Sequence, residues 1–406
     1  MPPNAHPVNT MWVYALKSDH LGHVIRFKAP AELGLDVYGG DVNTAYLNAA
    51  LAIRQYLRSI NGYPCEVDGH VYVVLKALYG LRQSGREWNS ELNHWFLGHG
   101  YQRSLTEPCL YYLIEQETVV YYLGIEVTQT KGNITLSQGK YTREILKRFG
   151  YEQAHPVGNP METNMRFAPR DVSETSDTSF KYHEAIGMLM YLATSTRSDL
   201  AFPLWQLSRF VANPSTKNVG ALKSVSRYVA GTQDYGITYS RLHQSNSEVV
   251  VDGFGDSDWA NDPDQRKSTT GFVFLVAGGA ISWMSRRQSR IALSTAEAEY
   301  VALCEATMEA VATSNILQEI LPNHAIKLRI GIDSQAAYVM ATNPTYSRRK
   351  RHVELRWYFV REHVQKGIIK LHKVRGDENP ADAFTKALEK KHLKRLLEFV
   401  GITNGK

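Results

Sequence analysis

Short apolar runs separated by turn residues fill the last third of the chain and predict a sheet. A strand over Val249–Val251 leads into the polar run Gly255–Asp258, and strands over Gly271–Ala277 and Ala280–Arg286 are joined by Gly278–Gly279, a dipeptide typical of hairpin turns. Helices then alternate with strands: a helix Ser294–Ile320, a strand Lys327–Ile332, a short helix from Ser334, a helix Arg351–Gln365, a strand Ile368–Val374 and a last helix near Pro380–Leu388. This order indicates a mixed five-stranded sheet with flanking helices.

A helical pattern precedes this region. Between residues 182 and 231 apolar side chains recur three and four positions apart, and Asn213–Pro214 separates two such helices. Residues 1 to about 160 mix strand-like runs with helices near Asp41 and over Arg86–Phe96. A stretch rich in Ser, Thr and Asp then predicts a linker. We therefore divide the chain into five segments: residues 11–160, 161–180, 181–240, 248–388 and 389–406.

Composition favours a globular protein that binds a polyanion. Hydrophobic residues make up 43% and charged residues 21% of the 406 residues, and the net charge is +6, which fits folded domains. Two basic runs suit nucleic acid; a solvated helix face is the alternative, which we favour for the second run taken alone. The runs are Arg348, Arg349, Lys350, Arg351 and His352, and then Lys386, Lys390, Lys391, Lys394 and Arg395.

Cysteine usage and hydropathy indicate the compartment. The three cysteines lack metal-ligand spacing, so a reducing setting is the default. There is no run of about 18 apolar residues, and the N-terminal sequence lacks the apolar core of a secretory signal. We expect an intracellular protein, cytoplasmic or nuclear, without a membrane partner.

Four acidic residues stand where the predicted sheet would bring them together. Asp256 ends the first strand, Glu299 lies one turn into the long helix, Asp333 ends the fourth strand, and Asp382 begins the last helix. In open sheets such positions face one cleft. Carboxylate oxygens suit Mg²⁺, and two ions about 4 Å apart can promote phosphodiester cleavage. Each acid alone is more simply a cap or a solvated residue, but the four together predict a site for two Mg²⁺ or Mn²⁺ ions.

Several sequence runs carry a resemblance to a known family. In the last region they are GDSDWAND, RKSTTGFVF, AISWMSRRQSRIALSTAEAEYVAL, IDSQAAYVMATNP, RRKRHVELRWYFVRE and ENPADAFTK. Upstream they are WVYALKSDHLGHVIRFKA, DVNTAYLNAAL, VYVVLKALYGLRQSGREW, YYLGIEV, LSQGKYTREILKRF, MLMYLATSTRSDLAFPLWQLSRFVANP and VSRYVAGTQDYG. With these runs the chain, from about Trp12 to Leu388, resembles the polymerase–ribonuclease H region of copia-type LTR retrotransposon Pol polyproteins.

The resemblance implies a multidomain fold of the α/β and α+β classes. Its parts would be a truncated reverse transcriptase palm (11–160), a linker (161–180), a helical connector (181–240), a ribonuclease H-like domain (248–388) and a basic C-terminal tail (389–406). It also implies that the four acids are metal ligands and that the Arg348–His352 run lies near an RNA–DNA hybrid. Template or primer backbone would contact Arg82 and Arg86.

The polymerase half departs from the family pattern. A reverse transcriptase palm needs one carboxylate after its first strand and a pair in a Tyr-x-Asp-Asp hairpin. Asp41 matches the first, and the pair is absent. The chain passes from Val120 directly to Tyr121 where the family has several dozen residues, and a second jump follows Ala29. Because one carboxylate cannot assemble a two-metal site, we expect no DNA synthesis.

Two functions are consistent with these features. The first is an enzyme that cleaves the RNA of RNA–DNA hybrids and contacts phosphates and 2′-hydroxyls, with little sequence preference. The second is a catalytically silent relic that only binds nucleic acid through its basic surface. Cleavage that Asp333→Asn abolishes while binding persists would distinguish them.

Overall fold

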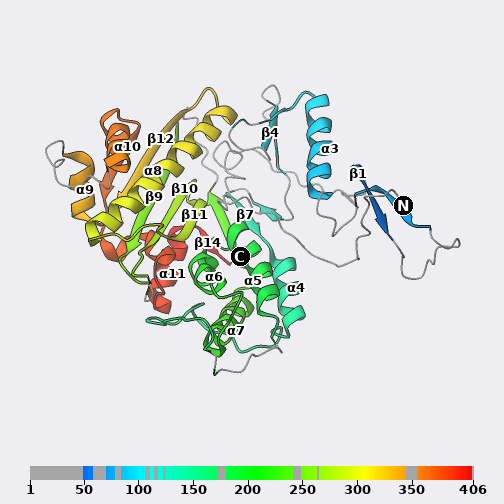
Figure 1. Cartoon of the computed structure of the whole chain (residues 1–406). Helices are drawn as coiled ribbons and strands as arrows, with labels where there is room; N and C mark the ends of the chain where they lie inside the picture. Colours follow the sequence, from blue (N-terminus) through cyan, green and yellow to red (C-terminus); the bar gives the residue numbers. More distant parts are fainter. Residues whose placement is uncertain are drawn as a thin grey trace. The chain divides into compact units, whose positions relative to one another are not determined.

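The described part of the chain divides into two compact units. The computed structural model describes residues 49–57, 70–77, 84–103, 105, 110–113, 118–121, 125–130, 132–171, 173, 180–240, 248–262, 265–343 and 354–404 (Figure 1). The described residues up to Tyr121 belong to the first unit, and those from 125 to 404 belong to the second. None of the helices in these ranges is long and apolar enough to cross a membrane.

The described residues of the first unit form two small antiparallel sheets and one helix. Strands β1 (Ala50–Leu57) and β2 (Tyr72–Lys76) pair with each other, and β3 (Gln102–Arg103), β4 (Leu110–Leu113) and β5 (Thr118–Tyr121) form a three-stranded sheet. Helix α3 (Ser84–Gly98) confirms the helix expected over Arg86–Phe96 and buries Trp88 against Ala49 and Ala77. The β4–β5 hairpin continues through the Val120–Tyr121 junction.

The five-stranded mixed sheet predicted for the last region is confirmed. Its order is β11–β10–β9–β12–β13, with antiparallel pairing from β11 to β9 and parallel pairing from β9 to β13. Every residue of β10 is buried, as expected for an apolar strand covered on both faces. The strands are β9 (Glu248–Asp258), β10 (Thr269–Val276), β11 (Gly279–Arg287), β12 (Ala325–Ile332) and β13 (Ile369–Lys373).

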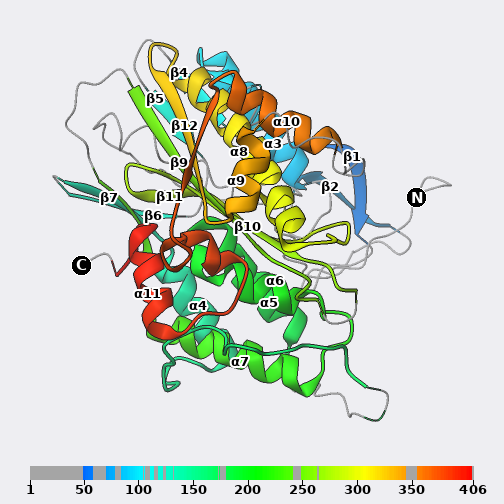
Figure 2. The same ribbon diagram turned by 90° about the vertical axis from the view of Figure 1, so that its left-hand side faces the viewer.

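One face of this sheet is covered by helix α8 (Thr295–Ile320), with α9 (Gln335–Thr342) and α10 (Glu354–Gln365) packed beside it (Figure 2). The start of α8 is fixed by side-chain capping. The Ser294 hydroxyl accepts the backbone N–H of Glu297 at 3.2 Å, and the Glu297 carboxylate accepts the N–H of Leu293 at 2.9 Å. These bonds satisfy donors that the first helical turn leaves unpaired.

The helical connector lies on the other side of the sheet from α8, where it packs against β11 (Figure 2). Its helices are α5 (Tyr182–Ser195), η2 (Ser198–Leu200), α6 (Ala201–Ser208) and α7 (Thr216–Gly231). They share one apolar core with α4 (Gly139–Phe149), which contributes Ile145 and Leu146. The indole N–H of Trp283 in β11 donates to the carbonyl of Ala193 in α5 at 2.8 Å, so the connector is joined to the sheet.

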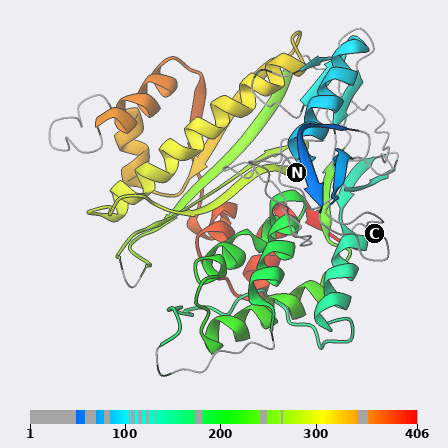
Figure 3. The same cartoon turned by 45° about the vertical axis from the view of Figure 1, so that its right-hand side comes forward.

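A second sheet joins segments that the sequence assigns to three different parts. Its antiparallel strands, in spatial order, are β14 (Ile402–Thr403), β8 (Gly236–Ser240), β7 (Asn133–Ser137) and β6 (Glu126–Gln129). β6, β7 and α4 therefore belong with the connector, and not with the first unit as a boundary at residue 160 would require. In Figure 3 the red C-terminal segment lies beside the green connector helices.

The C-terminal elements differ from expectation. The helix predicted near Pro380–Leu388 is a short 3-10 helix, η5 (Pro380–Phe384), preceded by η4 (Gly376–Glu378), and the α-helix comes later, in α11 (Lys390–Phe399). The segment expected as a basic tail is thus helix and strand. Phe384 is fully buried under β10, where a Cβ at Gly271 would lie 2.8 Å from it. η5 therefore packs closely against β10.

Part of the predicted linker is packed as well. Met161 and Phe167 are buried in the connector core, and the side chain of Asn218 donates to the carbonyl of Ala168 at 3.0 Å. Residues 172 and 174–179 lie outside the described ranges. The described part of this segment therefore packs into the connector.

Candidate metal and nucleic-acid site

The sheet brings Asp256 and Asp333 to one edge. β9 and β12 are parallel neighbours, with Gly331 paired to Phe254, so the residues that follow these positions emerge on the same side. Asp256 lies near the end of β9 with 3% of its surface exposed, and Asp333 follows the last residue of β12. Parallel pairing thus places two carboxylates from distant parts of the sequence side by side.

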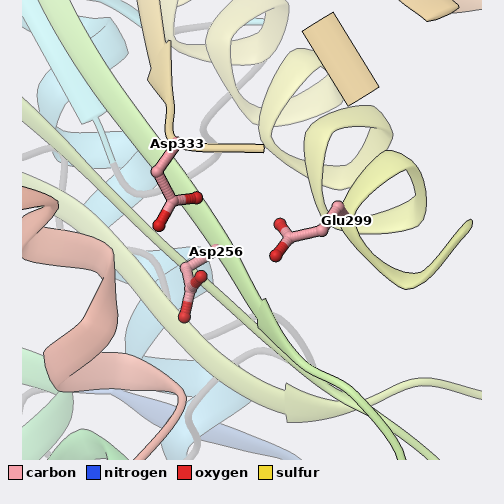
Figure 4. A group of neighbouring side chains, drawn as sticks. All are labelled: Asp256, Glu299 and Asp333. Atoms are coloured by element: carbon pink, nitrogen blue, oxygen red, sulfur yellow. The ribbon is translucent and has the colours of Figure 1, made fainter. Parts of the chain in front are cut away.

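Glu299 completes a group of three. It lies in the second turn of α8, which crosses β9 and β12. One carboxylate oxygen from each of Asp256, Glu299 and Asp333 lies within 4.8 Å of the other two. Figure 4 shows the three side chains pointing toward one another from a strand, a helix and a strand end. The structure therefore brings together three of the four acids chosen from the sequence as mutual neighbours.

Asp382 lies next to this group, on the side of Asp256. Asn379 anchors its segment, because the buried amide of Asn379 donates to the carbonyl of Gly255 at 3.1 Å and accepts the N–H of Ala381 at 3.1 Å. The hydroxyl of Thr385 donates to Oδ2 of Asp256. η5 is thereby attached to β9 on both sides of Asp382, which is 4% exposed.

A lysine stands among these carboxylates. Nζ of Lys386 lies 2.9 Å from Oδ1 of Asp382 and 3.9 Å from Oδ2 of Asp256. A second lysine, Lys373, donates to the backbone carbonyl of Asp333. Lys386 was expected on a solvated helix face, and that expectation is wrong: its head group faces two buried acids, although its side chain remains 43% exposed.

Burial and like charge raise the pKa values of the acids. Burial, followed by the charges of Asp256 and Asp333, raises the pKa of Glu299 to about 9. Burial and then Asp256 raise the pKa of Asp382 to about 7, despite the opposing effect of Lys386. The pKa of Asp333 is raised by burial and by Asp256. Without a cation, several negative charges at this edge disfavour one another.

The donor set fits divalent cations. Mg²⁺ is bound by oxygen ligands at about 2.0–2.1 Å and typically keeps several waters, so the ligand oxygens of one ion lie at most about 4.2 Å apart. Carboxylate oxygens within 4.8 Å of one another are close to that spacing. Asp256, Glu299 and Asp333 are thus suited to hold one ion, and Asp256 with Asp382 offers oxygens for a second.

Other residues chosen from the sequence lie elsewhere. Asp41, Arg82 and the Arg348–His352 run fall outside the described residues. Arg86 lies exposed on α3 of the first unit, where its guanidinium contacts the Glu87 carboxylate at 2.9 Å. The structure therefore describes the four predicted acidic ligands, but of the predicted nucleic-acid contacts it describes only Arg86.

Asp262 is a buried acid whose role sequence reasoning missed. Its position in the loop after β9 is typical of a turn acid, but the residue is only 2% exposed and its carboxylate contacts Arg209 at 3.1 Å and Arg287 at 2.5 Å. Arg209 follows α6 of the connector, and Arg287 ends β11. Burial alone would raise the pKa of Asp262, but the hydrogen bond from Arg287 and the charge of Arg209 lower it below its usual value. Asp262 thus links the connector to the five-stranded sheet.

Three residues at the acidic edge were also missed: Asn379, Thr385 and Lys386. Only Lys386 had a signal, since it stands four positions after Asp382 and such pairs meet on one turn of helix. The contacts of Asn379 and Thr385 join residues more than 120 positions apart. The spacing of residues within a short stretch of sequence does not predict such contacts.

This chain is similar to a reverse transcriptase family and to Pol polyproteins of plant transposons. A family described as "Reverse transcriptase (RNA-dependent DNA polymerase)" matches residues 30–120. The retrovirus-related Pol polyprotein from transposon TNT 1-94 of Nicotiana tabacum is 29% identical over 486 positions, covering 99% of this chain and 36% of that protein. The corresponding polyprotein from transposon RE2 of Arabidopsis thaliana is 29% identical over 403 positions, covering 89% of this chain and 27% of that protein. The chain thus spans about a third of the length of these relatives.

A solved structure is also similar. The foamy viral protease–reverse transcriptase in complex with an RNA/DNA hybrid has a TM-score of 0.38 and 12% identity, covering 83% of this chain and 43% of that chain. Because this TM-score is below 0.5, the fold is argued from the sheet topology, and the relationship is argued from the sequence relatives.

The tobacco alignment also bears on the internal gaps. It extends over 486 positions, whereas this chain has 406 residues, so at least 80 aligned positions have no residue here. The family match begins at Pro30 and ends at Val120. These are the two points at which the sequence jumps relative to the family pattern.

Proposed function

Because this chain belongs to the copia-type retrotransposon Pol family and carries a reverse transcriptase–ribonuclease H-like region, we propose that it retains metal-dependent cleavage of RNA in RNA–DNA hybrids. The observation that carries the proposal is the convergence of Asp256, Glu299 and Asp333, whose carboxylate oxygens lie within 4.8 Å of one another. Asp382 adjoins them through Asp256.

Each acid has a role in this proposal. Asp256, Glu299 and Asp333 would hold one divalent ion, and Asp256 with Asp382 would hold a second. When bound, such ions supply an activated water and stabilise the leaving oxygen of a phosphodiester. The Thr385 hydroxyl fixes Oδ2 of Asp256, which keeps the shared ligand in one orientation. Mg²⁺ is the expected metal, and Mn²⁺ would serve the same oxygen ligands.

The proposed substrate is an RNA–DNA hybrid. A net charge of +6 favours binding to nucleic acid, and the Arg348–His352 run is the proposed contact to the hybrid backbone. Recognition through phosphates and 2′-hydroxyls gives little dependence on base sequence. Arg82 and Arg86 are proposed backbone contacts of the polymerase remnant.

A hybrid-cleavage assay tests the nuclease proposal. The full chain with Mg²⁺ is expected to shorten the labelled RNA strand of a hybrid, and EDTA is expected to stop it. Asp333→Asn is expected to lower the rate by a factor of at least about 10³, because a ligand of the proposed metal site is lost, while hybrid binding persists. Asp252→Asn is the matched control: Asp252 lies on β9, the strand that pairs with β12, and its carboxylate pairs with Arg329 at the surface, so cleavage should be unchanged.

The alternative is a relic that only binds nucleic acid. It predicts hybrid binding by the wild-type chain with no Mg²⁺-dependent cleavage, and no difference between wild type and Asp333→Asn. Either result in the assay above would favour the relic over the enzyme.

We propose further that DNA polymerase activity is absent. The chain contains no two consecutive Asp residues, and the reverse transcriptase match ends at Val120, where the Tyr-x-Asp-Asp hairpin of the family would follow. Asp41 alone cannot hold two ions. Primer extension on an RNA template, with Mg²⁺ and with Mn²⁺, should show no incorporation above that of an Asp41→Asn variant. Template-dependent extension that Asp41→Asn removes would contradict this.

A further inference from the structure

We propose that Lys386 acts as a built-in counter-cation for the Asp256–Asp382 side of the acidic cluster, so that the protein without nucleic acid binds one divalent ion and not two. The inference rests on the proposed metal site. It adds a positioning residue that controls when the second ion enters.

The four acids do not form a symmetric cluster. Asp256, Glu299 and Asp333 form a mutual group within 4.8 Å. Asp382 stands outside that group, against Asp256 and Lys386, with its Oδ1 at 2.9 Å from the lysine nitrogen. One side of Asp256 is therefore arranged as an open oxygen site, and the other side already faces a positive charge.

The lysine lies where a second cation would be needed. Its nitrogen is within ion-pair distance of both Asp382 and Oδ2 of Asp256, at 2.9 and 3.9 Å. A metal held by these two carboxylates would need oxygens that the ammonium group already faces. The two cations therefore oppose each other by charge.

Local structure holds Lys386 in this position. Its backbone N–H donates to the carbonyl of Asp382 at 3.1 Å, which closes one turn and brings the two side chains to the same face. The adjacent Thr385 hydroxyl donates to Oδ2 of Asp256. Lys373, the other lysine nearby, donates to the backbone carbonyl of Asp333 and so leaves the open carboxylate oxygens to a metal.

The arrangement is reversible. Because the Lys386 side chain is 43% exposed, its flexible stem can carry the ammonium group away from the acids without disturbing the core. A phosphate of bound nucleic acid offers the displaced ammonium group a new anionic partner. Binding of the hybrid would then free Asp382 and Asp256 for the second ion.

Calorimetric titration of the full chain with MnCl₂, without nucleic acid, tests this inference. Wild type is expected to bind one Mn²⁺ at the cluster, and Asp256→Asn is expected to bind none there. Lys386→Met is expected to bind two, because the adjacent positive charge that opposes the second ion is gone. Lys386→Gln repeats the test with a polar side chain, and Lys386→Arg, which keeps the charge, should bind one. Lys366→Met removes a lysine that pairs with Glu362 on the surface of α10 and should match wild type.

The outcomes separate the two claims. Two Mn²⁺ ions in wild type, or one in both neutral Lys386 variants, would overturn the role of Lys386 and leave the metal site intact. Equal binding by wild type and Asp256→Asn would remove the metal site itself, and the inference with it. A circular dichroism spectrum of each variant that matches wild type shows that the stoichiometry reports on a folded chain.

Discussion

Like charges meet at the acidic edge, and opposite charges meet at Asp262. At the edge, burial raises the pKa of Glu299 to about 9, and Asp256 and Asp333 contribute to the shift. At Asp262, two arginines lower the pKa of a carboxyl that burial would otherwise raise. The first arrangement costs stability unless a cation is bound, and the second stabilises the fold at neutral pH.

Glu299→Gln should stabilise the metal-free protein. Between pH 4.5 and about 9 the folded state holds a proton on Glu299 that the unfolded state has lost, so stability falls as pH rises through this window. Removing the carboxylate should raise the free energy of unfolding at pH 8 by on the order of 1–3 kcal/mol. Urea unfolding in EDTA measures this. In Mg²⁺ the order should reverse, since wild type alone keeps the full ligand set; a less stable Glu299→Gln in EDTA would contradict the account.

Asp262→Asn should destabilise the protein at neutral pH by about 2–4 kcal/mol, because two arginines lose a buried charged partner. Since the folded-state pKa of Asp262 lies below its ordinary value, this stabilisation is present above that ordinary value of 3.8 and is lost as pH falls through the lower one. Thermal unfolding from pH 7 to pH 3 should show the difference shrinking. Asp234→Asn, which breaks a surface pair with Arg143, should change stability by less than about 1 kcal/mol; an equal effect of both variants would count against the bridging role.

The sequence predicted the buried acids of the acidic edge but not the role of Asp262. The four acids could be chosen because each stands at a strand end or a helix start. Asp262 could not be distinguished from a turn acid, because Arg209 lies 53 positions away, in another part of the fold. The charges around a buried side chain come from residues that can lie far away in the sequence, so the neighbouring sequence does not identify them.

At the scale of elements, strongly patterned segments were predicted well and short ones poorly. α8 and four of the five strands follow the expected ranges closely, whereas β9 continues beyond the expected Val249–Val251 to Asp258. The last predicted helix was wrong because η5 is held by contacts to β9 and β10 and not by helical periodicity. Its sequence contains Pro380 in the first turn and a fully buried Phe384, a pattern that an α-helix would share.

Asn379→Ala tests whether η5 positions Asp382. Loss of the bond to Gly255 and of the cap on Ala381 should cost about 2–3 kcal/mol, and the apparent Mg²⁺ requirement for cleavage should rise. Asn379→Asp keeps an acceptor for the Ala381 N–H but loses the donor to Gly255, so it should fall between wild type and Asn379→Ala. Urea unfolding and a Mg²⁺ titration of cleavage check both readouts. Unchanged Mg²⁺ dependence in Asn379→Ala would show that η5 does not set the position of Asp382.

At the scale of the second unit, contacts between distant segments decide the architecture. The Tyr239 hydroxyl donates to the carbonyl of Ala280 at 2.6 Å, Trp283 donates to Ala193, and β14 pairs with β8. The sequence pattern predicted the connector and the five-stranded sheet, but it did not predict that the two pack against each other. Which strands pair across 160 residues is a property of the packed chain and not of any window within it.

Ending the chain after Phe399 should weaken the whole second unit. It removes β14 and the buried side chains of Val400 and Ile402, which are 1% and 2% exposed, for an expected loss of about 3–5 kcal/mol. Amide hydrogen exchange in β8 should accelerate together with that in neighbouring β7, since both belong to the same sheet. Ending the chain after Asn404 keeps β14 and should leave exchange unchanged. Equal exchange in all three chains would mean that β14 contributes nothing.

The most direct test of the central claim is to locate the metal. Crystals of the full chain with a hybrid and Mn²⁺, measured at the manganese absorption edge, should show anomalous density at the oxygens of Asp256, Glu299 and Asp333, and a second peak between Asp256 and Asp382. Manganese bound elsewhere, or none at these carboxylates with the hybrid in place, would contradict the account.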